Sequence, residues 1–166
     1  MKVAIFLGSK SDSETMKKAA DLLREFGVDF KSYVISAHRA GDLLVKTIRK
    51  VEEEGAKVII AGAGLSAALP GVIASRTILP VIGVPLECVS PGKSNGLAGM
   101  DALLSIVQMP PQIPVATVGI NSSKNAAYLA LQILALGDDT LKNKLLEFRK
   151  KLASDAEKDC GNGDVL

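Results

Sequence analysis

Short apolar runs alternate with longer amphipathic stretches along most of the chain, and this alternation restricts the fold more than any other feature. The apolar runs lie at residues 3–8, 28–36, 56–64, 79–85 and 113–120. The stretches between them repeat their apolar residues at helical spacing. Because parallel strands are joined by crossover connections that are usually helices, this order predicts an α/β fold, a three-layer α/β/α sandwich around a parallel five-stranded sheet.

The amphipathic stretches predict the helices and their ends. Between residues 13 and 27, Met16, Ala19 and Leu23 recur at helical spacing and Gly27 ends the pattern. Further helices are predicted at 40–55, 65–77, 100–109, 122–137 and 138–158. The last one has an apolar stripe made of Leu141, Leu145, Phe148 and Leu152. The last two helices carry more apolar surface than a five-stranded monomer covers, which favours a homo-oligomer.

Composition narrows the class of protein. The chain has 166 residues, 48% hydrophobic and 4% aromatic, with no Trp, so one domain with a closely packed aliphatic core is expected over residues 1–156. Residues 157–166 are expected to form a flexible tail. The formal net charge of +2 is too small to favour a nucleic-acid or membrane partner. No apolar run approaches the length of a membrane span.

Cysteine usage points to a reducing compartment. Cys88 and Cys160 are too few, and too far apart in the sequence, for a disulfide framework or a metal site. The apolar run at the N-terminus is too short for a signal peptide. We therefore expect a cytoplasmic protein.

Four loops of unusual composition follow predicted strands, at 8–12, 36–42, 61–71 and 85–99. In open α/β sheets, ligands bind beyond the carboxyl ends of the strands. Because the carboxyl ends of parallel strands lie at one edge of the sheet, we expect these loops to converge on a site for a small molecule.

The first loop, GSKSD at 8–12, has the residues of an anion-binding turn. Gly8 lets the backbone come close to a ligand, and Ser9 and Ser11 can donate hydrogen bonds to phosphate oxygens. Asp12 can accept hydrogen bonds from ribose hydroxyls. The alternative is an ordinary turn in which Asp12 or Ser13 caps the following helix.

The second loop contains SAHR, residues 36–39, with the only histidine of the chain. An imidazole exchanges a proton near neutral pH, so His38 is a candidate acid or base. Arg39 can bind phosphate with its planar, permanently charged group, and Ser36 is a further expected substrate contact. The alternative is an exposed His-Arg pair in a turn.

The third loop is built from small residues, and we expect a planar ring to lie against its backbone. The expected contacts are Gly62, Ala63, Gly64, Ala68 and Leu69. Close packing between a strand and a helix is the alternative interpretation of the same residues.

The fourth loop is rich in Gly, Ser and Pro. Its Lys93 is a candidate lid residue that could reach a carboxylate or phosphate, and a simple solvated connection is the alternative. Cys88 in the same loop is expected to be an inert small hydrophobic residue.

Taken in order, GSKSD, SAHR, AGAG with LPG, LPVIGVP and SIVQMP resemble the family of 5-aminoimidazole ribonucleotide carboxylases and N5-carboxyaminoimidazole ribonucleotide mutases, over residues 2–153. The resemblance implies a flavodoxin-like fold, an octamer, and an enzyme of purine biosynthesis that carboxylates C4 of its ribonucleotide without metal or cofactor. It implies that Ser9, Asp12 and Arg39 contact the phosphate and ribose. It implies that His38 is the general acid and base at the imidazole carbon.

Two features depart from this family. Ala68 stands where the mutases have a histidine before LPG, and the 86–99 loop is longer than theirs. The carboxylases that use CO2 directly also lack that histidine, but they have a lysine at the position of Arg39. Both departures resemble the carboxylase domain of LarB, which acts on a pyridine nucleotide. Three functions therefore stay open: an imidazole ribonucleotide mutase or carboxylase, a LarB-like carboxylase or hydrolase, and a catalytically silent nucleotide-binding protein.

Overall fold

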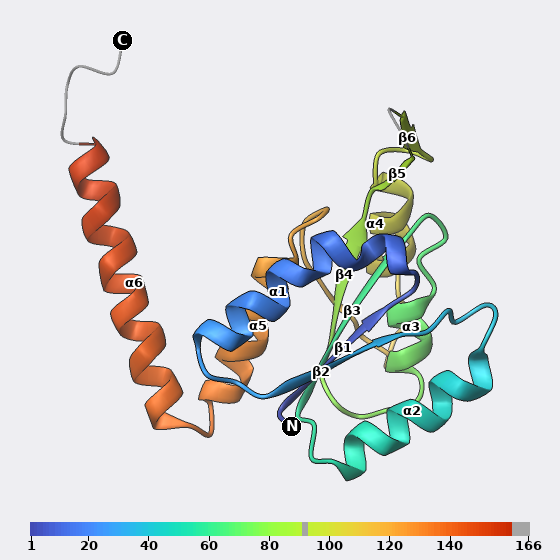
Figure 1. Cartoon of the computed structure of the whole chain (residues 1–166), viewed down its shortest axis with the longest axis horizontal. Coiled ribbons are helices and arrows are strands. Elements are labelled where there is room, and N and C mark those ends of the chain that lie inside the picture. Colours follow the sequence, from blue (N-terminus) through green and yellow to red (C-terminus); the bar gives the residue numbers. More distant parts are fainter. Residues whose placement is uncertain (91–92, 161–166) are drawn as a thin grey trace.

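The main sheet has the five predicted strands, all parallel. The computed structural model describes residues 1–90 and 93–160, and its sheet is ordered β2-β1-β3-β4-β7 (Figure 1). The strands are β1 (Val3–Leu7), β2 (Phe30–Val34), β3 (Val58–Gly64), β4 (Val81–Leu86) and β7 (Ala116–Thr117). This order is that of the flavodoxin-like fold, so the predicted fold class is confirmed.

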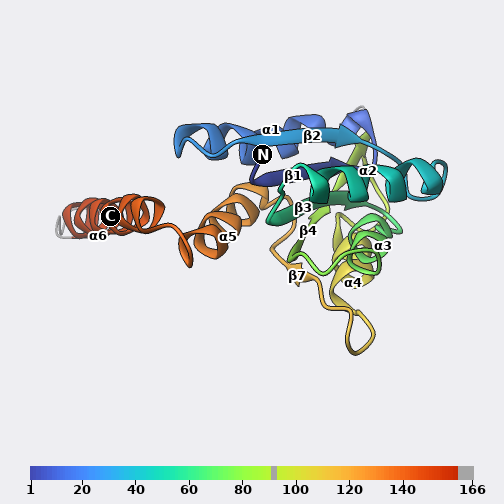
Figure 2. The ribbon, with the colours of Figure 1, turned by 90° about the horizontal axis from the view of Figure 1, so that it is seen from below.

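Helices cover both faces of the sheet. One face packs against α1 (Ser13–Glu25) and α5 (Ser123–Ala135). The other face packs against α2 (Gly41–Glu53), α3 (Leu69–Ala74) and α4 (Met100–Val107) (Figure 2). Each face has its own apolar cluster, so the sheet is the middle layer of a three-layer sandwich.

The central strand β1 shows why its sequence reads as one unbroken apolar run. Ile5 and Leu7 belong to the cluster with α1 and α5, while Ala4 and Phe6 belong to the cluster on the opposite face. All residues of the strand are buried. Burial on both faces is typical of a parallel sheet, and it removes the polar alternation of a half-exposed strand.

Two elements, α3 and β7, have less than half of their predicted length. α3 begins at Leu69 because Leu65 takes a left-handed backbone with φ 53°, and the Ala67 N–H closes a tight turn on the Leu65 carbonyl at 2.8 Å. β7 has only two residues, and three prolines that lack a backbone N–H stand between residues 110 and 114 just before it. The predictions for 65–77 and 113–120 are thus right in type and wrong in extent.

The segment 86–99, predicted as a loop, contains a small hairpin. β5 (Cys88–Ser90) pairs antiparallel with β6 (Lys93–Asn95), so that Cys88 lies opposite Asn95. The hairpin follows β4 closely and stands beyond the carboxyl edge of the sheet (Figure 1). The proposed lid role of Lys93 concerns a side chain that lies outside the described residues.

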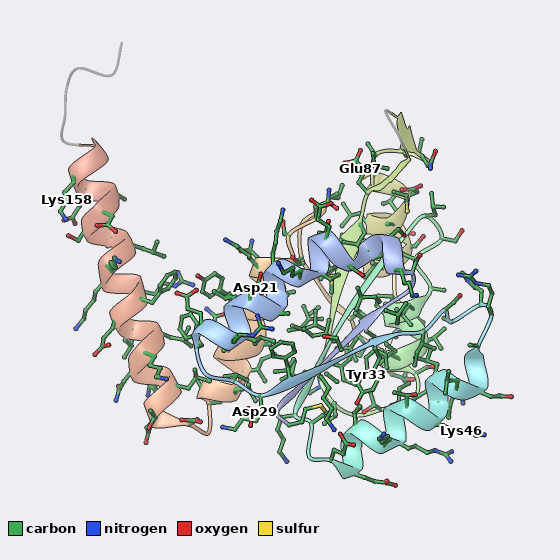
Figure 3. The ribbon with its side chains drawn as sticks, viewed as in Figure 1. Asp21, Asp29, Tyr33, Lys46, Glu87 and Lys158 are labelled. Carbon is green, nitrogen blue, oxygen red and sulfur yellow. The ribbon has the colours of Figure 1, made fainter. Side chains whose placement is uncertain are left out.

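The last helix, α6 (Asp139–Cys160), projects from the rest of the chain (Figures 1 and 2). Its first half is anchored, because Leu141 is buried and Phe148 stacks on Tyr128 of α5 with ring centroids 5.1 Å apart. Leu152 is 48% exposed, and Lys158 lies on the part of α6 farthest from the sheet (Figure 3). Three of the four residues of the predicted stripe, Leu141, Leu145 and Phe148, are therefore packed, and Leu152 is largely exposed. Residues 161–166 of the expected tail lie outside the described residues.

Within the described part of the chain, no helix combines the length and the apolar composition that a membrane span needs.

Candidate active site

A cavity of about 280 Å³ lies at the carboxyl ends of β1 and β3, where most of the predicted site residues meet. The expected residues that line it are Ser9, Ser11, Asp12, Ser36, His38, Ala63, Gly64, Ala68 and Leu69. β1 pairs with β2 on one side and with β3 on the other. The chain therefore adds one strand to one side of β1 and then returns to add the later strands to the other side. Such a switch point is the usual ligand site of a doubly wound sheet. The predicted convergence of the loops is therefore observed for all but two of the described expected residues.

Arg39 and Gly62 are the two described residues that do not line the cavity. The Arg39 side chain is exposed, next to His38 in the sequence. Gly62 is explained by packing, because a Cβ at this position would lie 2.5 Å from the Met16 sulfur. Its carbonyl accepts a hydrogen bond from the Gly8 N–H at 3.2 Å, which ties the first loop to β3. The packing interpretation of Gly62 thus accounts for this glycine without a ligand.

The turn at residues 8–12 forms a short 3-10 helix, η1 (Lys10–Asp12), with a reciprocal capping arrangement. The Asp12 carboxylate accepts the Ser9 N–H at 2.9 Å, and the Ser9 hydroxyl oxygen accepts the Ser11 N–H at 3.4 Å. The Ser11 hydroxyl also donates to the Ser9 hydroxyl at 2.9 Å. Ser9 is therefore the cap of η1, while Asp12 stands at the N-cap position of α1 but makes no side-chain cap hydrogen bond to that helix. The Ser9 and Ser11 N–H groups are already used within the turn, and the Ser11 hydroxyl donates to Ser9, which leaves the Ser9 hydroxyl hydrogen for a ligand.

The Asp12 carboxyl is the buried ionisable group of this turn, 9% exposed. Burial raises the pKa of Asp12 above its usual value, and the hydrogen bonds from the Ser9 N–H and the Ser11 hydroxyl oppose that rise. The folded protein therefore binds a proton at Asp12 more tightly than the unfolded chain does. A desolvated acceptor of this kind is suited to a ligand hydroxyl that replaces the lost water.

Replacing Asp12 with Asn is expected to stabilise the protein at neutral pH. The free energy of unfolding that Asp12 contributes falls as the pH rises from the unfolded pKa of 3.8 through the raised folded pKa, because the charged form is the one that burial disfavours. The amide oxygen of Asp12→Asn still accepts the Ser9 N–H, and the charge is gone.

Thermal unfolding of both proteins across the pH range checks this expectation. The variant should melt at a higher temperature at pH 7, and the gap should close as the pH falls to about 3. An equal or lower melting temperature at pH 7 would contradict a net desolvation penalty at Asp12.

His38 lies in the connection between β2 and α2, and its side chain is exposed at the cavity wall. The Ile35 N–H donates to the Leu7 carbonyl at 2.9 Å, which extends the β1 pairing up to the start of this connection. The Ala40 N–H donates to the Ser36 carbonyl at 2.9 Å and closes a turn around His38. The strand pairing thus places the imidazole beside the serine turn that follows β1.

The cavity wall also contains residues that were not predicted as contacts. They are Ala37, Leu65, Ser66, Ala67 and Cys88, while Gly8 lines the cavity as the close backbone approach at this residue predicted. The left-handed backbone of Leu65 gave no signal in the sequence, because this conformation is uncommon for a residue with a side chain. Cys88 reaches the cavity through the hairpin, and its thiol packs so closely on Gly64 that a Cβ there would collide with the sulfur. Burial, followed by the charges of Asp12 and Asp101, raises the pKa of the Cys88 thiol, so the thiol is neutral at pH 7.

No group of three or more metal-binding side chains occurs among the residues that the structure describes. The cavity instead gathers hydroxyls, one carboxylate, one imidazole and a wall of small residues. Such a set can bind a polar ligand and exchange protons with it.

Known proteins resemble this chain over nearly its whole length. The family model described as AIR carboxylase matches residues 2–155. The N5-carboxyaminoimidazole ribonucleotide mutase of Pyrococcus abyssi is 54% identical, covering 91% of this chain and 83% of that protein. The mutase of Saccharolobus solfataricus is 47% identical, with 93% and 94% covered. A crystal structure of Treponema denticola PurE has a TM-score of 0.84 at 28% identity and covers 98% of both chains. The chain belongs to the AIR carboxylase family.

Proposed function

We propose that this protein is an enzyme of purine biosynthesis that moves the carboxylate of N5-carboxyaminoimidazole ribonucleotide from nitrogen to C4 of the imidazole ring. The mutases at 54% and 47% identity support this reaction over the alternatives. The observation that carries the proposal is the cavity in which His38 meets the turn of Ser9 and Asp12. A LarB-like action on a pyridine nucleotide is not favoured, and neither is a catalytically silent protein.

One imidazole is sufficient for the proton transfers of this rearrangement. Protonation of the carbamate nitrogen breaks its bond to the carboxyl carbon and releases CO2. C4 then attacks CO2, the new carbon–carbon bond forms, and C4 loses its proton. His38 gives one proton to the nitrogen and takes one proton from C4, so it returns to its starting protonation state after each turnover. The substitution of the family's second histidine by Ala68 is compatible with this balance.

Retention of CO2 is the demanding step, because the released molecule must not diffuse away. Ala63, Gly64, Ala67 and Ala68 form a wall of small, apolar residues in the cavity. Such a wall lets CO2 stay close to C4 while it keeps water out, and proximity of this kind lowers the barrier. The reaction is an isomerisation without change of oxidation state, so we propose no redox cofactor.

The ribonucleotide itself is held at its polar end. The Ser9 hydroxyl donates to the phosphate, Asp12 accepts from the ribose hydroxyls, and the exposed Arg39 reaches the phosphate from the rim. In this pose the imidazole ring lies toward the small residues of β3, with its C4 near His38.

Two parallel incubations test the proposed function. The protein is mixed with N5-carboxyaminoimidazole ribonucleotide, and separately with aminoimidazole ribonucleotide and bicarbonate. Formation of the C4 carboxylate only in the first, at low bicarbonate, supports the mutase reaction. Equal rates in the second would identify a CO2-dependent carboxylase. Turnover of nicotinate mononucleotide or dinucleotide, with neither imidazole substrate consumed, would overturn the proposal in favour of the LarB-like alternative.

We also propose that the protein is a homo-oligomer, and the resemblance to the family implies an octamer. Residues 102–123 contain no charged side chain, although 23% of the whole chain is charged. On α4, Met100, Leu104 and Val107 are 46%, 46% and 50% exposed along one side of the helix. An apolar stripe without charges fits the same stripe of a second copy better than it fits the strongly charged α6.

Replacing Leu104 with Glu is expected to weaken the assembly. Two copies of the carboxylate would face each other across an apolar contact that offers them no cation. Sedimentation velocity at micromolar concentration should show smaller particles for Leu104→Glu than for the parent protein. Lys46→Glu, an exposed position on α2, is the matched control and should leave the particle size unchanged (Figure 3). A parent protein that sediments as a monomer would contradict the proposal.

A further inference from the structure

The turn between β6 and α4, residues 96–99, packs against a part of the cavity wall. A Cβ on Gly96 would lie 2.9 Å from the Leu65 side chain and would collide with the Asp101 carboxylate. A Cβ on Gly99 would lie 3.4 Å from the backbone nitrogen of Glu87, at the base of the hairpin (Figure 3). The turn therefore touches Leu65, which lines the cavity, and the segment that leads directly to Cys88.

This turn needs an external restraint, because its backbone is unfavourable. Gly96, Ala98 and Gly99 have φ values of 78°, 51° and 85°. Glycine accepts such angles, but Ala98 is a residue with a side chain in the left-handed region, which costs free energy. The surrounding structure must hold a conformation of this kind in place.

Asp101 supplies that restraint. One carboxylate oxygen accepts the Leu97 N–H at 3.3 Å, and the other accepts the Ala102 N–H at 2.9 Å. The residue stands in the first turn of α4, where a negative charge is favoured by the helix dipole. Gly99, the cap residue of α4, has no side chain that could accept the Ala102 N–H. The Asp101 carboxylate thus links the unfavourable turn to the start of the helix.

We propose that Asp101 is a positioning residue of the active site, which fixes the 96–99 turn and through it the cavity wall formed by Leu65 and Cys88. Asp101 itself does not line the cavity, so it acts on the substrate only through these two residues. The proposal deepens the proposed function and rests on it for the identity of the ligand.

The charge of Asp101 has a second, separate effect on the same wall. Burial is the main cause that raises the pKa of the Cys88 thiol, and the charge of Asp12 and then that of Asp101 add to it. A neutral thiol neither attacks CO2 nor repels a carboxylate, whereas a thiolate would do both. The hydrogen bonds of the Asp101 carboxylate thus carry the positioning role, while its charge is a smaller influence on the thiol than burial and Asp12, and the two effects can be measured independently.

Two substitutions separate the hydrogen bond from the charge. In Asp101→Ala both are lost, and KM for the ribonucleotide should rise about 10-fold while kcat changes less than about 3-fold. In Asp101→Asn the single amide oxygen can accept either the Leu97 N–H or the Ala102 N–H but not both, so KM should recover in part, to a value between those of the parent and Asp101→Ala. Rescue by the amide is not expected of a residue that acts only by its charge.

Thiol titration measures the charge. The rate of Cys88 alkylation by iodoacetamide is followed against pH, in a Cys160→Ala background so that one thiol reacts. Both Asp101→Ala and Asp101→Asn should lower the pH at which alkylation reaches half of its maximum rate, because both remove the negative charge. This readout needs no turnover, so its failure is distinct from a failure of the proposed function.

An Asp101→Ala protein that is folded, by circular dichroism and sedimentation, and that keeps the parent KM would overturn the positioning role. An alkylation profile unmoved in both variants would overturn the role of the charge. Should Asp101→Ala not fold, Asp101→Ser is measured instead. Its shorter hydroxyl side chain is expected to reach the Leu97 N–H poorly, so its KM should lie between the values for the parent and those expected for Ala, and a parent-like KM would overturn the proposal.

Discussion

Replacing His38 with Asn is expected to lower kcat by about 100-fold or more while the ribonucleotide still binds with nearly its normal affinity. His38 is the only histidine of the chain and lines the cavity beside Ser9 and Asp12. Asn keeps a polar side chain of similar reach but cannot shuttle a proton between C4 and the carbamate nitrogen. The loss should therefore appear in kcat, measured under saturating substrate, and only weakly in the dissociation constant measured by calorimetry.

Because the His38 side chain is exposed, a small molecule added to the solution can take its place, and this allows a control for the loss of the proton carrier. In His38→Ala the space at the mouth of the cavity is open to solvent, so added imidazole should restore part of the lost turnover in proportion to its concentration. Restoration of this kind assigns the defect to a missing proton carrier rather than to a distorted pocket. Turnover of His38→Asn close to that of the parent would reclassify the imidazole as structural.

Replacing Arg39 with Ala is expected to weaken ribonucleotide binding by roughly 10- to 100-fold, with a much smaller change in kcat. The guanidinium is exposed and does not line the cavity, so we expect its contact with the phosphate to form at the rim when substrate binds. Such a contact holds the ground state and the transition state alike, and its loss therefore raises KM rather than lowering kcat.

Two further variants make the Arg39 measurement specific. Arg39→Lys keeps the charge but loses the planar, two-pronged geometry, and it should fall between Ala and the parent protein. Arg49→Ala removes an exposed guanidinium from α2 at a position that does not line the cavity, and it should bind as the parent does. An affinity of Arg39→Ala equal to that of Arg49→Ala would remove Arg39 from the phosphate site.

The fold could be predicted because its strongest signals are local. β1 and β3 are buried on both faces of the sheet, so nearly every residue in them is apolar and each strand is an unbroken apolar run in the sequence. The extent of α3 could not be predicted, because the helix start depends on the left-handed backbone at Leu65. The β5–β6 hairpin was missed for a similar reason: its Gly, Ser and Pro residues are typical of loops, and its pairing is visible only in three dimensions.

Much of the candidate site could be inferred from position alone. Ser9, Asp12 and His38 each follow a strand of a parallel sheet, and the sheet geometry brings such residues to one edge. Leu65 and Cys88 could not be inferred, because they reach the cavity through a strained turn and a hairpin. Gly62 is required by packing against Met16. A run of small residues in the sequence does not show whether each of them makes room for a ligand or for a neighbouring side chain.

The pairing of β1 with both β2 and β3 sets an order on how the molecule assembles. β1 precedes both of its partners in the sequence, and its partner on one side, β3, begins only at Val58. Until then one edge of an apolar strand has no neighbour, and closing so long a loop is slow. Most of the cavity lining lies between Gly8 and Leu69, so the nucleotide site is largely made before β4 and β7 complete the sheet, and Cys88 is the last residue to join its wall.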